Sequence, residues 1–108
     1  MPGVEQTQAE RNERAEHARL EAQAKADELQ WLMSDKKGRR FMWRLLAETG
    51  IYQQSYVGGD FAATAFREGR RSMGLQVLAS IMEICPGRFN EMQKESKQNE
   101  RRSNPNSK

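Results

Sequence analysis

The sequence predicts an all-α protein with a long N-terminal helix, a small helical hairpin core, a short C-terminal helical turn and a disordered tail. Residues 5–33 contain no glycine or proline and are rich in strong helix formers. Two later segments, 35–49 and 64–85, repeat large apolar residues at helical spacing. Residues 51–59 between them are short and irregular and include the turn signal Gly58-Gly59, so we expect a connecting loop there.

Residues 1–33 are predicted to form a charged helical arm. Glutamates precede basic residues by four positions, as in Glu10–Arg14 and Glu21–Lys25, an order that stabilises a helix. The repeating strip along this helix is almost entirely alanine, which buries little area and therefore holds a partner weakly. We favour a solvated helix that joins the core only at its C-terminal end. The alternative is an arm that lies along a neighbouring subunit.

Residues 34–92 are predicted to form a small helical structural domain. Its first helix follows the N-cap residue Asp35 and stops at Gly50, a residue type that commonly ends helices. Its central helix follows the N-cap residue Asp60 and covers 64–85, and Pro86-Gly87 ends it. Seven apolar residues of these two helices are expected to form the core: Phe41, Trp43, Leu45, Phe66, Met73, Val77 and Ile81.

The central helix contains two features that call for close neighbours. Gly69 and Gly74 each cost about 1 kcal/mol relative to alanine, so we expect another backbone, such as that of residues 41–46, to approach them closely. A helix with one solvent-exposed face needs a single apolar strip, but this helix also has a second strip, which includes Leu75 and Leu78. We therefore predict that another chain completes this side of the helix.

Residues 93–108 are predicted to form a disordered basic tail, because no apolar residue follows Ser96. The remaining core is small, and such units commonly need a disulfide, a metal or a partner. Cys85 is the single cysteine and His17 the single histidine, which argues against an internal disulfide and a structural zinc site. Association is therefore the favoured source of further stability, and we predict an oligomer.

No constellation typical of an enzyme is found in the sequence. Cys85 stands among apolar residues without a nearby histidine, and Gly58-Gly59 lacks the rest of a phosphate-binding loop. We therefore expect no catalysis, no cofactor and no small-molecule substrate. No apolar run approaches 18 residues, and the N-terminus is acidic and polar, so we expect no membrane span and a soluble protein made in a reducing compartment.

The formal net charge of +3 is unevenly distributed. Residues 1–33 carry −3, residues 34–89 carry +4 and residues 90–108 carry +2. Four cations crowd the start of the first core helix, where the helix dipole disfavours them, and we expect compensation from Asp35, Glu68 or an acidic partner. If the two core helices pack antiparallel, their basic residues could merge into one patch that contacts phosphates without reading sequence.

Two motifs in the middle of the chain, GRRFMWRLL at 38–46 and TAFREGRRSMG at 64–74, resemble a family of small phage virion structural proteins. The type member of this family comes from a short-tailed (podovirus-like) Bordetella phage, and the resemblance covers about residues 34–92. It implies membership of a phage particle, after synthesis in the host cytoplasm, and no enzymatic activity. It defines neither a place in the particle nor binding residues.

We therefore predict a non-enzymatic virion structural protein that acts through protein–protein assembly with other virion proteins and with copies of itself. The arginines would make bidentate contacts with carboxylates of the partner. The hypothetical interface comprises Arg40, Arg44, Arg67, Arg71, Leu75 and Leu78. The alternative function is a DNA-associated internal or ejected head protein that binds nucleic acid non-specifically through the basic patch.

Overall fold

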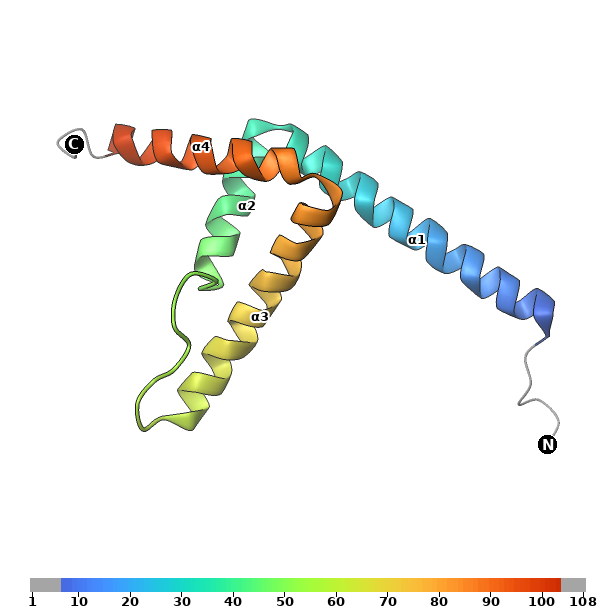
Figure 1. Cartoon of the computed structure of the whole chain (residues 1–108), viewed down its shortest axis with the longest axis horizontal. Helices are drawn as coiled ribbons and strands as arrows, with labels where there is room; N and C mark the ends of the chain where they lie inside the picture. The colour runs from blue at the N-terminus through green and yellow to red at the C-terminus, as the bar shows by residue number, and fades with distance from the viewer. Residues whose placement is uncertain (1–6, 104–108) are drawn as a thin grey trace.

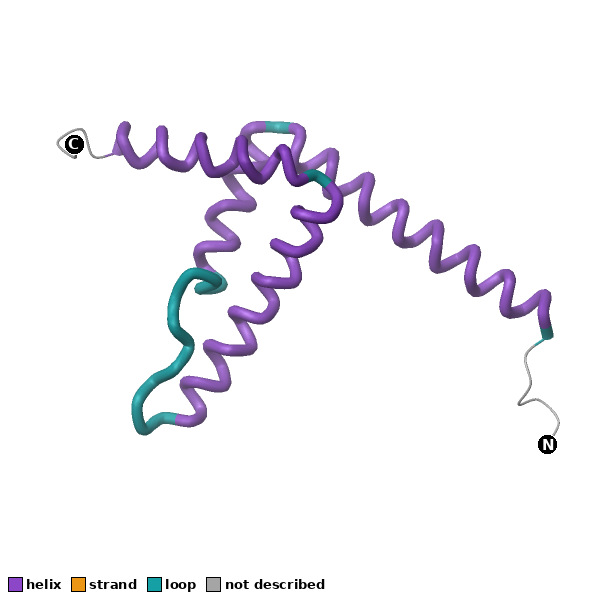
Figure 2. Tube along the Cα trace, viewed as in Figure 1, coloured by secondary structure: helices purple, strands orange, loops and turns teal. Residues whose placement is uncertain are grey.

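The computed structural model describes residues 7–103, which form four helices. They are α1 (Gln8–Ser34), α2 (Lys36–Glu48), α3 (Phe61–Ile84) and α4 (Pro86–Ser103), as Figure 1 shows. Figure 2 shows helices and loops and no strand in this part of the chain. The prediction of an all-α fold is confirmed.

Helix α1 is an arm that contacts the other helices only near its C-terminal end. The hydroxyl of the N-cap residue Thr7 accepts a hydrogen bond from the Glu10 amide at 3.1 Å, and every residue from Gln8 to Lys25 is exposed. Met33, by contrast, is completely buried. Figure 1 shows the arm projecting away from the rest of the molecule. The arm is therefore held by its last turns alone.

Helices α2 and α3 run antiparallel, side by side, and form the predicted hairpin (Figure 1). Gly50 has a φ of 74°, a left-handed conformation that suits glycine and ends α2. The carboxylate of Asp60 caps α3 by accepting a hydrogen bond from the Ala63 amide at 2.9 Å. The predicted N-cap Asp60 is confirmed, and α3 therefore starts at Phe61, ahead of the apolar repeat that begins at Thr64.

The two glycines of α3 have different surroundings. A Cβ atom built at Gly74 would lie 2.0 Å from Thr49 Oγ1 and 2.6 Å from Ile51 Cγ2. Close approach at Gly74 therefore exists, but it is made by side chains of Thr49 and Ile51, just after α2, and not by the predicted backbone of segment 41–46. A Cβ atom at Gly69 would meet nothing within 4 Å, so the expected close approach at Gly69 was wrong.

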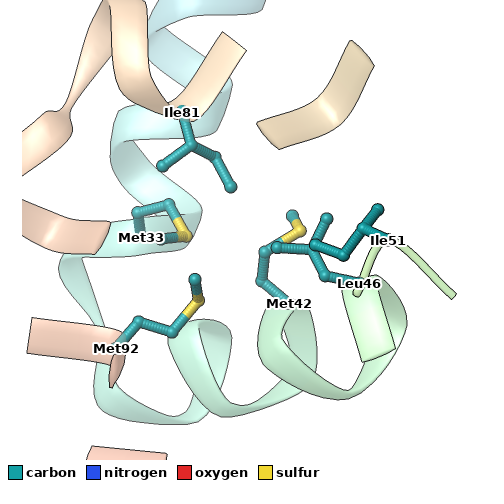
Figure 3. Packing of buried hydrophobic residues seen from close by; sticks show 6 residues of the cluster. All are labelled: Met33, Met42, Leu46, Ile51, Ile81 and Met92. Atoms are coloured by element: carbon teal, nitrogen blue, oxygen red, sulfur yellow. The ribbon is translucent and has the colours of Figure 1, made fainter. Parts of the chain in front are cut away.

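The core lies where all four helices meet, and Figure 3 shows its six buried apolar side chains. Each helix contributes to it, and so does the loop after α2. The six residues are Met33, Met42, Leu46, Ile51, Ile81 and Met92. Methionine accounts for half of this set, and its flexible side chain fills the irregular space where helices cross at different angles. The core is as small as its composition predicted.

The predicted core differs from the one observed. Phe41, Leu45, Phe66 and Met73 are exposed, with exposed fractions of 52%, 38%, 69% and 59%. The prediction failed for them because α1 and α4 pack on another side of the hairpin, so that the neighbouring residues Met42 and Leu46 turn inward instead. Trp43 and Val77 are half-buried at the edge of the core, and Ile81 is fully buried.

The C-terminal segment also differs from the prediction. Residues 93–103 are not disordered, and the expected short helical turn is the long helix α4. Met92 and Ser96 are buried on one side of this helix, and Glu95 is bound to Arg39 of α2. A polar sequence therefore forms an ordered helix because an ion pair attaches it to the core. The last part of the predicted tail, residues 104–108, lies outside the described residues.

The molecule is thin and extended. Its principal extents are 71 × 42 × 15 Å, and its radius of gyration is 19.9 Å. A compact domain of this length has a radius of gyration of about 13 Å. Helices usually bury their apolar sides between two packed layers, and a thickness of 15 Å leaves room for little more than one layer. Within residues 7–103, no helix consequently covers one broad side of the helical hairpin.

Candidate protein interface

A buried arginine attaches α4 to the hairpin and so determines which surfaces stay open. Arg39 is 7% exposed and donates to both carboxylate oxygens of Glu95, at 2.8 and 3.0 Å. Its third hydrogen bond goes to the carbonyl of Met33 at 2.9 Å, and Glu91 Oε2 lies 3.5 Å from its Nη2. The hydrogen bond with Glu95 raises the pKa of Arg39 and lowers the pKa of Glu95.

This arrangement compensates the excess of positive charge that the sequence places at the start of α2. The expected sources of compensation were Asp35, Glu68 or an acidic partner. The structure supplies it from Glu95 and Glu91 of α4, whereas Glu68 is engaged by Ser55 and Arg71. Asp35 contributes as expected, because its charge also raises the pKa of Arg39. Sequence reasoning missed Arg39 and Glu95 because they are far apart in the chain. Their only sequence signal was the excess of cations in the first turn of α2.

The uncovered side of the hairpin carries large apolar side chains. Met42 and Leu46 of α2 are buried in the core that α2 shares with α3, and Gly74 of α3 lies against Thr49 at the end of α2. In each helix, the residue directly before a contact residue is rotated away from it by about 100° around the helix axis. Because the two helices are antiparallel, these preceding residues point toward the same broad side of the hairpin. A residue seven positions earlier, two turns away, shares that side. This apolar face comprises Phe41, Leu45, Phe66 and Met73.

The rim of the apolar face is polar. Arg44 and Glu48 join Phe41 and Leu45 around a shallow depression of about 180 Å³ on α2. On α3, the guanidinium of Arg70 lies 5.7 Å from the centre of the Phe66 ring, within the range of a cation–π contact. An apolar centre with a polar rim is the usual composition of a protein–protein interface.

The six residues of the hypothetical interface lie on separate surfaces. Arg44 borders the apolar face, whereas Arg40 lies beside α4. Arg67 and Arg71 line a small depression next to the loop that follows α2. Glu68 Oε1 also lies 3.7 Å from Arg71 Nη1, so part of the basic charge is neutralised within α3.

The two leucines of that hypothesis also differ from each other. Leu75 is exposed at 38%, but Leu78 packs against the core and contributes little surface. They belong to the side of α3 that turns away from the apolar face, as their positions along the helix require. The second apolar strip of α3 is thus partly completed by the protein's own core.

A groove lies between the first turns of α2 and the middle of α4. Its volume is about 320 Å³, with Trp43 and Met92 among its lining residues. Four cations border it: Lys36, Lys37, Arg40 and Arg102. The carboxylates of Asp35 and Glu95 also line the groove, but Glu95 is bound to Arg39. The groove therefore has a positive balance of charge.

The basic residues of α2 and α3 do not line a common cleft. Lys36, Lys37 and Arg40 belong to the groove at the start of α2, whereas Arg67 and Arg71 lie beside the loop at its other end. The antiparallel packing that was expected to merge them places the beginnings of the two helices at opposite ends of the hairpin (Figure 1). The groove and the depression therefore hold separate groups of these basic residues.

Residues with metal-binding or reactive side chains were also located. No group of three or more His, Cys, Asp or Glu residues within 7–103 is placed to hold a metal ion. Cys85 packs at the edge of the core, and burial raises the pKa of its thiol, partly offset by the nearby charge of Arg88. None of the described helices is both long and apolar enough to cross a membrane.

The chain was compared with known proteins. Neither a curated protein nor a solved structure matches it. A family model, that of the Bbp19-like phage proteins, matches residues 29–94, which is more than half of the chain, and the chain therefore belongs to this family.

Proposed function

We propose that this phage protein is a non-enzymatic structural component of the virion that acts by assembling with other virion proteins and with copies of itself. The observation that carries the proposal is the apolar face of the α2–α3 hairpin. Its residues Phe66 and Met73 are 69% and 59% exposed although they stand on well-formed helices. Fully burying a side chain of this size stabilises a complex by about 1.5–3 kcal/mol.

The shape of the chain supports the same function. A molecule that is 15 Å thick has a broad surface but a core of six buried apolar residues. Covering the apolar face would supply the second layer that helical domains normally possess. The family to which the chain belongs is a family of phage proteins, and the most direct source of such a layer in a phage is another component of the particle.

The proposal can be tested by making the apolar face polar. Phe66→Gln combined with Met73→Gln should retain wild-type helix content by circular dichroism, because both side chains are exposed and glutamine favours helices. Incorporation into particles of the phage that encodes the chain should fall about tenfold or more.

Phe61→Gln is the matched control. Phe61 is also an exposed phenylalanine of α3, with an exposed fraction of 90%, but its position along the helix places it away from the apolar face. We expect this variant to enter particles as the wild type does. Normal incorporation of the Phe66/Met73 double variant would refute the proposed role of the face.

A further inference from the structure

The charges of α1 are sorted onto two sides of the helix. At 100° per residue, all six carboxylates of α1 fall within an arc of about 140°, and the four basic residues fall within the opposite part of the circumference. The acidic side comprises Glu10, Glu13, Glu16, Glu21, Asp27 and Glu28. This sorting gathers the carboxylates on one broad side of an arm whose residues from Gln8 to Lys25 are exposed.

The length of the arm needs a physical reason. From Gln8 to Lys25 the side chains of α1 are exposed, and local pairs such as that of Glu16 and Arg19 stabilise this part of the helix. Exposed pairs of this kind contribute little. An arm of 27 residues, about 40 Å long, is therefore better explained if a second surface stabilises it.

The basic groove between α2 and α4 has the complementary charge. Lys36, Lys37, Arg40 and Arg102 border it, and the apolar residues Met92 and Trp43 also line it. The arm of the same chain cannot occupy the groove as one continuous helix, because Glu13 lies about 30 Å along α1 from the start of α2. The occupant must come from elsewhere.

We propose that the acidic side of α1 from one copy of the protein docks onto the Lys36–Lys37–Arg40–Arg102 groove of a second copy. This inference rests on the proposed assembly function and names the partner and the contact. If two copies exchange arms reciprocally, the contact closes as a dimer, and if it repeats in one direction, it produces a ring or an open chain of copies. Since its charges lie at the surface, the contact weakens with salt.

Sedimentation velocity of the full chain tests the contact directly. We expect oligomers at about 0.05 M salt and their dissociation toward monomers at about 0.5 M. Lys36→Glu combined with Lys37→Glu should weaken self-association at least about tenfold at low salt. Glutamate in the first turn of a helix interacts favourably with the helix dipole. Because Lys36 lies near the Glu95 carboxylate, circular dichroism and urea unfolding of this variant must match the wild type before its association is compared.

A charge exchange identifies the partner surfaces. Glu21→Lys combined with Glu28→Lys on α1 should also impair self-association. Mixing this arm variant with the Lys36→Glu/Lys37→Glu groove variant should restore association, because a basic arm then meets an acidic groove. Lys94→Glu combined with Lys97→Glu is the control: both lysines are exposed on α4 but do not border the groove, so association should remain at the wild-type level.

Three outcomes would overturn the proposal: wild-type association of the groove variant, failure of the mixture to associate, or equal loss in the control. If the wild type binds duplex DNA and the groove variant does not, while self-association of the groove variant is unchanged, the groove binds DNA phosphates instead of the arm. The Phe66→Gln/Met73→Gln variant separates this test from the proposed function. If that variant enters particles normally but still shows salt-sensitive oligomers, the arm contact stands and the apolar face is wrong.

Discussion

Arg39 of α2 and Glu95 of α4 form a two-pronged ion pair, with Nε–Oε1 and Nη2–Oε2 distances of 2.8 and 3.0 Å, across 56 positions of the chain. The same guanidinium donates to the carbonyl of Met33 at the end of α1. One side chain therefore joins three helices. Because the core formed by the described residues has six buried apolar side chains, this polar junction is a main determinant of where α4 lies.

Replacing Glu95 by glutamine should destabilise the protein. Glutamine keeps the size of the side chain but leaves the buried Arg39 charge without its full counterion, and removing one partner of a buried pair costs about 3–5 kcal/mol. The Glu95 side chain is 20% exposed and Glu91 remains nearby, so we expect a loss of about 2 kcal/mol in urea unfolding. Glu100→Gln, at an exposed position of α4, should leave the urea concentration at the unfolding midpoint unchanged. Equal midpoints for the two variants would contradict the assigned role of Glu95.

The same pair should make stability depend on acidic pH. The hydrogen bond from Arg39 lowers the pKa of Glu95 from its ordinary value of 4.5, so the unfolded chain takes up this proton more readily than the folded one. The stabilisation is therefore present above pH 4.5 and is lost as the pH falls through the lower folded-state pKa. Urea unfolding of the wild type and of Glu95→Gln over this range should show a steeper decline for the wild type. Parallel curves would mean that other carboxylates determine the decline.

Gly69 and Gly74 provide a matched pair for the packing of α3. Gly69→Ala should stabilise the protein by up to about 1 kcal/mol, because alanine favours the helix and its Cβ meets nothing within 4 Å. Gly74→Ala should destabilise it by about 2 kcal/mol or more, because the new Cβ would overlap Thr49 Oγ1 and Ile51 Cγ2. Thermal unfolding of both variants distinguishes them. Similar changes in both would show that the segment after α2 does not pack against Gly74.

Local features of the sequence predicted most of the helices correctly. Asp60 caps α3 through a nearby amide, and Gly50 ends α2 through its own backbone conformation. Both helix ends can therefore be predicted without knowing the tertiary fold. The family resemblance, carried by two motifs, is also confirmed. The matched segment begins at residue 29, before the expected boundary, and thereby includes Met33, the part of α1 that is buried in the core.

The core and the surfaces were harder to predict because they depend on where α1 and α4 pack. Phe41 and Met42 are adjacent and both apolar, and only the position of the other helices decides that Met42 is buried while Phe41 is exposed. Helix α4 has too few apolar residues to indicate packing, and its partner Arg39 lies in a distant segment. For the same reason the groove beside Arg40, which needs both helices, could not be recognised from either segment alone.

Shortening the chain tests whether α4 belongs to the folded unit. Ending the chain after Met92, at the boundary that the sequence predicted, removes Glu95 and the buried Ser96. The guanidinium of Arg39 then lacks the carboxylate that accepts two of its hydrogen bonds. We expect a loss of at least about 3 kcal/mol in unfolding free energy and a fall in helix content larger than the removed residues account for. Ending the chain after Ser103 removes none of the described contacts and should leave both quantities unchanged. Wild-type stability of the shorter chain would show that the first turns of α4 suffice, and the Arg39–Glu95 pair would then be dispensable for the fold.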